Sequence, residues 1–314
     1  MTQLVLDVDT GTDDAIAIML AALDPRLELL AVTTVAGNAS VEHTTENTLR
    51  VLDHIGVEAP VHRGAAGAIV PSTAVKDQAE RSRKIHGDYL DLPPARSHAK
   101  TTPAAEFLVS AFDGEPDRVL VPTGPLTNVA TALLLDPGLA QRIPRLVLMG
   151  GSHTRANVTP QAEFNIWGDP EAARIVLRSG IRDLTVVPLD ATHEALVSEA
   201  DCDRLAALGT PAGTAAASLI RRRIEGYEAI QPQAIRRSAP VHDALCVAYL
   251  IEPDVIATRE AHVDVELNGE LTRGRTVVDL RPIPAQPANA RWAYGADRER
   301  FFELLLGAFS RQPS

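Results

Sequence analysis

Cysteine is scarce in this sequence, with Cys202 and Cys246 as the only two among its 314 residues. Two cysteines are too few to build a disulfide framework. The first residues, Met1-Thr2-Gln3, lack the basic region of a secretory signal, and no apolar run approaches the roughly 18 residues that a membrane span needs. We therefore expect a cytoplasmic protein with reduced thiols and no membrane partner.

Positive charge is also in short supply. The sequence has 30 Lys and Arg residues against 41 Asp and Glu residues, which gives a net charge of −11. We therefore expect no nucleic-acid partner. The run Arg221-Arg222-Arg223 is isolated and is interpreted as a solvated helix face. No G-x-G-x-x-G follows the first apolar run, which argues against a dinucleotide-binding enzyme. What the chain does have is 45% hydrophobic residues, enough for a globular core.

Residues 4–14 organise the rest of the chain. An apolar run leads to Asp7, Gly11 permits a sharp turn, and apolar residues then repeat at helical spacing from Ala15 onward. This pattern predicts a strand, a turn and a helix.

Four carboxylates crowd this turn. Asp13 and Asp14 could simply cap the helix, but capping leaves Asp7 and Asp9 unexplained, because aspartate is depleted in strands. Ligands of open α/β sheets bind at this end of the strands. Carboxylate-rich sites suit Mg²⁺ or Ca²⁺, and no Cys/His spacing here suits zinc. The sequence therefore predicts a hard-cation site.

Strand-like and helix-like patterns alternate along most of the chain. Strands are predicted at 29–35, 59–62, 118–121, 145–149 and 184–188, with helices between them. This alternation predicts an α/β fold, in which a mostly parallel central sheet carries helices on both faces. We also expect a helical insertion at 197–250, a C-terminal β-hairpin at 263–280 that turns at Asn268-Gly269, and a single domain over 1–314. The irregular segment 64–101 is long enough to suggest a functional loop.

Four later stretches each place polar groups where an apolar run meets a loop: 36–38 (AGN), 123–128 (TGPLTN), 157–165 (NVTPQAEFN) and 241–244 (VHDA). Together with the opening DVDTGTDDA, their order and spacing resemble the inosine-uridine-preferring nucleoside hydrolase family. The resemblance extends to the LTRG segment at 271–274 and so covers almost the whole chain. Many family members have proline at the position of Thr10, a change that Gly11 makes tolerable.

The resemblance implies a calcium-dependent hydrolysis of ribonucleosides on an α/β fold. Asp9, Asp14, Asp243 and the backbone carbonyl of Thr123 are implied to hold Ca²⁺, and Asp9 to activate the Ca²⁺-bound water as general base. The implied ribose ligands are Asp13, Asn38, Asn157, Glu163 and Asn165, with Met149 beneath the sugar. Family members are commonly dimers or tetramers, so a homo-oligomer is expected.

The departing base needs a proton or a stacking partner. His242 and His86 match positions where family members carry a general acid, and histidine suits that role because its pKa lies near neutral pH. Each could instead be a histidine whose hydrogen bonds are made within the fold and that has no catalytic role. The loop that carries His86 matches the family pattern only loosely. Tyr227 is a candidate for the base pocket or for packing. Asp7 is assigned no direct role, and the preferred nucleobase stays open.

Two other functions are compatible with parts of the sequence. Asp7-Val8-Asp9 imitates the motif of haloacid-dehalogenase-type phosphatases, but Gly11 stands where that motif wants Thr or Val, and the AEFN segment would have no purpose. A non-catalytic nucleoside- or calcium-binding protein on the same scaffold is the second alternative.

Overall fold

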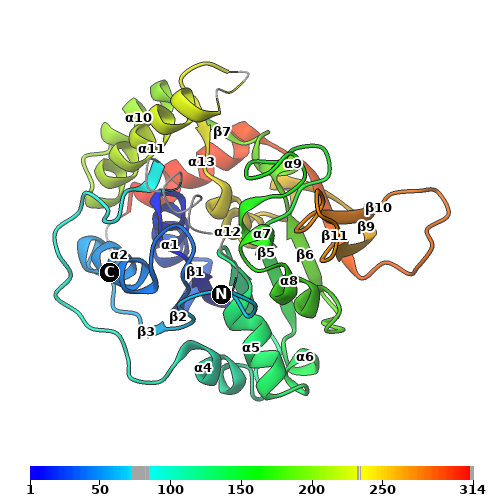
Figure 1. The fold of residues 1–314 in the computed structure, drawn as a ribbon. Helices are drawn as coiled ribbons and strands as arrows, with labels where there is room; N and C mark the ends of the chain where they lie inside the picture. Colours follow the sequence, from blue (N-terminus) through cyan, green and yellow to red (C-terminus); the bar gives the residue numbers. More distant parts are fainter. Residues whose placement is uncertain (72–81, 83–84, 232, 234, 312–314) are drawn as a thin grey trace.

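The computed structural model describes residues 1–71, 82, 85–231, 233 and 235–311, and its central feature is a nine-stranded sheet (Figure 1). The strand order is β10-β9-β11-β6-β5-β4-β1-β2-β3, and every neighbouring pair from β11 to β3 is parallel. The bounds are β1 Thr2–Val8, β2 Leu27–Thr34, β3 Val61–Arg63, β4 Val119–Pro122, β5 Arg145–Met149, β6 Leu184–Val187, β9 Ile256–Val265, β10 Thr276–Asp279 and β11 Ala290–Ala296. The predicted mostly parallel sheet is therefore confirmed.

Helices cover both faces of this sheet, which is why its strands read as continuous apolar runs. Leu4, Leu6 and Val8 of β1 face one hydrophobic core, whereas Val5 faces the other. The first core is covered by α1 Thr12–Leu23, α2 Val41–Ile55, α11 Pro211–Ile230, α12 His242–Ile251 and α13 Arg298–Phe309. The second is covered by α4 Ala104–Ala111, α5 Thr127–Leu135, α6 Leu139–Arg142 and α8 Pro170–Leu177. These two groups of helices lie on opposite sides of the sheet in Figure 1.

The predicted helical insertion at 197–250 contains α10 Glu199–Ala206, α11 and α12, and the short α9 Leu189–Thr192 precedes it. The Thr210 side chain caps α11 by accepting from the backbone N–H of Gly213. A short antiparallel pair that the local sequence pattern does not predict also lies here, β7 Leu196–Ser198 with β8 Ser238–Pro240. The pair brings the start of α10 next to the segment that leads into α12.

The C-terminal hairpin is present, but its predicted turn is wrong. β9 and β10 pair from Val265 opposite Thr276, so residues 266–275 form a long loop instead of a two-residue turn at Asn268-Gly269. Arg273 holds this loop to the body through Glu171 of α8 at 2.7 Å. The strand β11 was also missed, because its sequence ARWAYGA is poor in β-branched residues; it inserts between β6 and β9.

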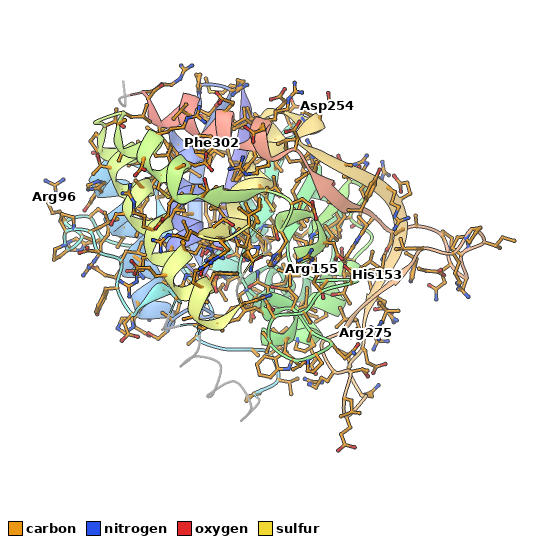
Figure 2. All side chains as sticks on the ribbon, turned by 90° about the horizontal axis from the view of Figure 1, so that it is seen from above. Arg96, His153, Arg155, Asp254, Arg275 and Phe302 are labelled. Atoms are coloured by element: carbon orange, nitrogen blue, oxygen red, sulfur yellow. The ribbon has the colours of Figure 1, made fainter. Side chains whose placement is uncertain are left out.

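The connections at the periphery carry exposed charged side chains. Arg96, Arg155 and Arg275 lie on separate loops, and Asp254 lies in η1 Pro253–Val255 (Figure 2). Within the described part of the chain, no helix combines the length and the apolar character that crossing a bilayer requires.

Candidate active site

A cavity of about 240 Å³ opens at the carboxyl ends of the central strands. Asp9 follows β1, Thr123 follows β4 and Met149 ends β5, so the parallel sheet brings these residues to one edge. The predicted residues in its wall are Asp9, Asp13, Asn38, His86, Thr123, Met149, Asn157, Glu163, Asn165, Tyr227, His242 and Asp243. Asp14 is fully buried next to them. Segments far apart in the sequence thus share one site, and the loop histidine His86 lies within it.

The first turn of α1 places two carboxylates at this edge. Asp14 accepts from the backbone N–H of Gly11 at 2.9 Å, which caps the helix, and from the Thr123 hydroxyl at 2.8 Å. Asp7 has a different role on the strand side. Its Oδ1 accepts from Thr33 and from Asn128, which links β1 to β2 and α5.

Buried carboxylates form a cluster suited to a cation. One oxygen each of Asp13, Asp14 and Asp243 lie within 4.8 Å of one another. Burial, together with the neighbouring carboxylates, raises the pKa of Asp14 to about 6 and that of Asp243 well above its usual range. Among the described residues, Asp13 Oδ1 has no hydrogen-bond partner. The all-oxygen donor set of this cluster fits a hard divalent cation.

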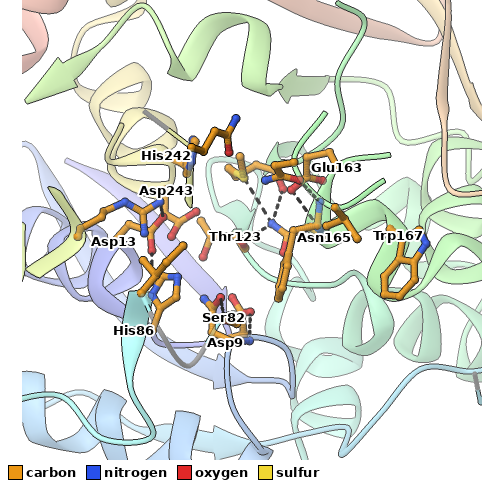
Figure 3. A pocket seen from close by; sticks show the side chains of 18 of the residues that line it. Asp9, Asp13, Ser82, His86, Thr123, Glu163, Asn165, Trp167, His242 and Asp243 are labelled. Atoms are coloured by element: carbon orange, nitrogen blue, oxygen red, sulfur yellow. Dashed lines mark hydrogen bonds and ion pairs between the residues drawn. The ribbon is translucent and has the colours of Figure 1, made fainter. Parts of the chain in front are cut away.

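This cluster differs from the implied ligand set in one member, since it contains Asp13 and not Asp9. Asp9 is 1% exposed, and its Oδ2 accepts from the backbone N–H of Asn38 at 2.7 Å. Burial raises the Asp9 pKa well above its usual range, as do the nearby Asp14 and Asp13 carboxylates. In Figure 3, Asp13 and Asp243 approach from one side of the cavity, and Asp9 lies below Thr123.

The opposite wall is formed by the AEFN segment at the start of α7 Phe164–Gly168. Glu163 caps this helix by accepting from the backbone N–H groups of Asn165 and Ile166, and it also accepts from Gly151 N–H. Burial raises the Glu163 pKa to about 7. Asn165 donates to the carbonyls of Thr123 at 2.7 Å and Met149 at 3.2 Å, so one amide ties β4 to β5 across the cavity floor.

Two further asparagines complete the polar wall. Asn38 accepts from the hydroxyl of Ser82, a cavity residue that the sequence analysis did not name. Asn157 accepts from the backbone N–H of Phe164, which anchors its loop to α7. Both side chains are thereby oriented before any ligand binds.

A hydrogen-bonded chain of side chains lies on the insertion side. His242 Nε2 and the Tyr227 hydroxyl are 2.7 Å apart, and His242 Nδ1 is 2.7 Å from the Thr192 hydroxyl. His86 Nδ1 accepts from the backbone N–H of Thr12 at 3.0 Å. Burial lowers the pKa of His86 to about 4 and that of His242 well below its usual range, so both rings are neutral at pH 7.

Arg223 corrects the interpretation of the basic run as a solvated face. Its side chain is 3% exposed, lines the cavity and pairs with Asp13 at 2.8 Å. A signal for this burial is present in the sequence, because Leu219, Arg223 and Tyr227 repeat at a spacing of four on the buried stripe of α11. Trp167 and Gln231 are further cavity residues that no motif indicated.

The mostly parallel sheet, covered on both faces, defines an α/β protein with a small-ligand cleft at the carboxyl edge of its strands. The chain belongs to the inosine-uridine preferring nucleoside hydrolase family, whose family model matches residues 4–303. It is an enzyme that hydrolyses the N-glycosidic bond of ribonucleosides.

Comparison with individual proteins agrees with this assignment. The chain is 38% identical to the pyrimidine-specific ribonucleoside hydrolase RihB of Escherichia coli O157:H7, over 96% of this chain and 95% of that protein. Its structure is similar to the purine-preferring ribonucleoside hydrolase from Gardnerella vaginalis, with a TM-score of 0.90, 32% identity and 98% of both chains covered. An inosine-guanosine nucleoside hydrolase gives a TM-score of 0.83 at 29% identity, again over 98% of both chains.

Proposed function

We propose that this enzyme uses Ca²⁺ held by Asp9, Asp14, Asp243 and the Thr123 carbonyl, and that Asp9 is its general base. The observation that carries the proposal is that the buried, neighbouring carboxylates of Asp14 and Asp243 lie at a cavity whose wall also holds Asp9, Thr123 and a set of amides. When bound, a divalent cation helps to orient water and a sugar diol and makes water easier to deprotonate. The family is metal-dependent, which supports a cation at this cluster.

The contacts and the pKa of Asp9 support its proposed role in proton abstraction. The backbone N–H of Asn38 occupies Oδ2, which leaves Oδ1 to accept a proton from water. A raised carboxyl pKa suits this work, because a base is most effective when its pKa approaches the operating pH.

The ribose is held by acceptors that also favour its transition state. Asp13, Asn38, Asn157, Glu163 and Asn165 are proposed to bind the sugar hydroxyls, with Met149 below the ring. Cleavage of the glycosidic bond develops positive charge on the ribosyl group. Carboxylates fixed around the ring stabilise that charge more than the neutral substrate, which is the differential binding that raises the rate.

The leaving base is proposed to face His242, Tyr227 and His86. Both histidines are neutral at pH 7, and a neutral imidazole still has one N–H to donate. The Thr12 N–H bond to Nδ1 of His86 leaves the N–H of that ring on Nε2. Tyr227 lies within hydrogen-bond distance of His242, so its hydroxyl can relay a proton between that ring and the base.

The substrate is proposed to be a ribonucleoside with a pyrimidine or a purine base, since the similar proteins are named for both classes. We further propose a single domain over 1–314, a cytoplasmic location, and a homo-oligomer, either dimeric or tetrameric. These proposals rest on the sequence and on the family.

A reducing-sugar assay with uridine, cytidine and inosine, each with and without a chelator, tests the proposal. We expect ribose release that the chelator abolishes and Ca²⁺ restores. Asp9→Asn is expected to lose most turnover, about 10²-fold or more, because it cannot accept the proton. Asp203→Asn, an exposed carboxylate paired with Arg221, is the control and is expected to retain activity. Wild-type turnover in a folded Asp9→Asn enzyme would refute the base assignment.

A further inference from the structure

Arg223 is a buried cation in the cavity wall, and its guanidinium is fixed from several sides. Nε donates to the Pro240 carbonyl at 2.6 Å, and Nη2 pairs with Asp13 Oδ2 at 2.8 Å. Thr12 Oγ1 and the Tyr227 hydroxyl lie 3.4 Å from Nη1 and Nη2, respectively. The charge is therefore fixed in position at the junction of α1, α11 and β8.

This ion pair leaves the two oxygens of Asp13 in different states. Oδ2 is occupied by Arg223, whereas Oδ1 is buried and, within the described chain, accepts no hydrogen bond. His86 Nδ1 lies 3.8 Å from this oxygen, beyond hydrogen-bond distance, and already accepts from Thr12 N–H. A buried acceptor without a donor is costly, so Oδ1 is suited to a hydroxyl that arrives with the substrate.

Asp13 also lies close enough to the carboxylates of the proposed cation site to become a further ligand of the cation. Its carboxylate belongs to the triad with Asp14 and Asp243, in which ligand oxygens lie within 4.8 Å of one another. A free carboxylate at that distance would be attracted to a divalent cation as a further ligand. The guanidinium opposes this by neutralising one charge of the triad and by holding Oδ2 toward α11.

We propose that Arg223 is a positioning residue that reserves Asp13 for a ribose hydroxyl and keeps it out of the cation's ligand set. This inference rests on the proposed function, because it takes Asp13 as a sugar ligand and Asp14 and Asp243 as metal ligands. It explains why a cavity rich in carboxylates contains a buried arginine. It also explains how Asp13 and Asp14, adjacent in sequence, can serve different ligands.

The test separates sugar binding from metal binding by calorimetry. Ribose is titrated into Ca²⁺-saturated protein, and Ca²⁺ is titrated into metal-free protein without sugar. In Arg223→Met we expect the Kd for ribose to rise at least about tenfold, the loss typical of one charged hydrogen bond, while the Kd for Ca²⁺ stays unchanged or falls. Arg221→Met is the matched control on the same helix, since Arg221 pairs with the exposed Asp203, and it is expected to change neither Kd.

A double-mutant cycle shows whether Arg223 acts through Asp13. Asp13→Asn is expected to weaken ribose binding, and adding Arg223→Met to it should change the Kd by no more than about twofold, because the partner is already gone. Two independent losses that add would overturn the proposal. Loss of Ca²⁺ affinity in Arg223→Met parallel to the loss of ribose affinity would also overturn it, since that result indicates a general structural role.

Arg223→Lys keeps the test decisive if Arg223→Met does not fold. The lysine retains the charge and lacks the planar fork, so we expect ribose affinity between those of the wild type and Asp13→Asn, with Ca²⁺ affinity unchanged. Weakened Ca²⁺ binding in Arg223→Lys would contradict the proposal. If the wild type hydrolyses nucleosides and Arg223→Met binds ribose normally, only this inference fails. If the wild type neither binds ribose nor hydrolyses nucleosides, the proposed function fails first.

Discussion

Gly37→Ala is a small change that should displace the carboxylate of Asp9 without altering its chemistry. A Cβ at position 37 would lie 2.1 Å from Asp9 Oδ2 and 2.9 Å from Pro125 Cδ. Real Cβ contacts essentially never fall under 3.0 Å, so the carboxylate has to move by about 1 Å. Because Asn38 N–H holds the same oxygen, this movement also breaks the bond that orients the Asp9 carboxylate.

We expect the displacement to lower kcat about 10²-fold, since a misplacement of about 1 Å in a catalytic site typically has that effect. Overpacking of this kind costs about 1–3 kcal/mol of folding free energy, so the protein should still fold. Initial rates of ribose release from uridine and inosine, with Ca²⁺ affinity by calorimetry and a thermal unfolding curve, make up the assay.

Gly67→Ala is the control, because its Cβ would have no heavy atom within 4 Å. It should keep wild-type kcat, Ca²⁺ affinity and stability. A Gly37→Ala enzyme that folds and turns over at the wild-type rate would show that the position of Asp9 does not limit the reaction.

Three further predictions concern the metal, the leaving group and pH. Chelation should lower the thermal midpoint, and free Ca²⁺ at 100 times its Kd should restore about 2.7 kcal/mol of stability; an unchanged midpoint would contradict a cation site in the fold. His242→Ala should slow natural nucleosides by about 10²-fold or more and spare p-nitrophenyl riboside, whose leaving group needs no proton, so equal losses on both substrates would argue against a leaving-group acid. Burial raises the pKa of Glu163 to about 7, so the folded protein binds the proton of this carboxyl more tightly than the unfolded chain does. Protonation of Glu163 therefore contributes its full share to the folding stability at a pH below the pKa of the carboxyl in the unfolded chain. This contribution is lost as the pH rises through about 7. Denaturant unfolding from about pH 5 to 7 should therefore show a decline of up to about 1.4 kcal/mol per pH unit relative to Glu163→Gln, and parallel curves for the two proteins would refute it.

The sequence by itself determined the alternating architecture and most of the site. Hydrophobic periodicity and turn residues are local signals, so the parallel strands and the helices between them were predictable. Polar residues placed after apolar strands had to meet, because the carboxyl ends of parallel strands share one edge. That rule brought Asp9, Thr123 and Met149 together from three distant segments.

The tertiary structure decided what local patterns do not encode. β11 is a strand because β6 and β9 flank it, although its own residues favour strand only weakly. Arg223 is buried because Asp13 and Pro240, more than 200 residues apart, meet over α11, whereas its neighbour Arg221 stays exposed. The cost of burying a charge depends on partners that folding brings from elsewhere in the chain. For that reason the aspartates and their proposed roles could be listed from the sequence and its family resemblance, but the buried pairing of Asp13 with Arg223 needed the three-dimensional structure.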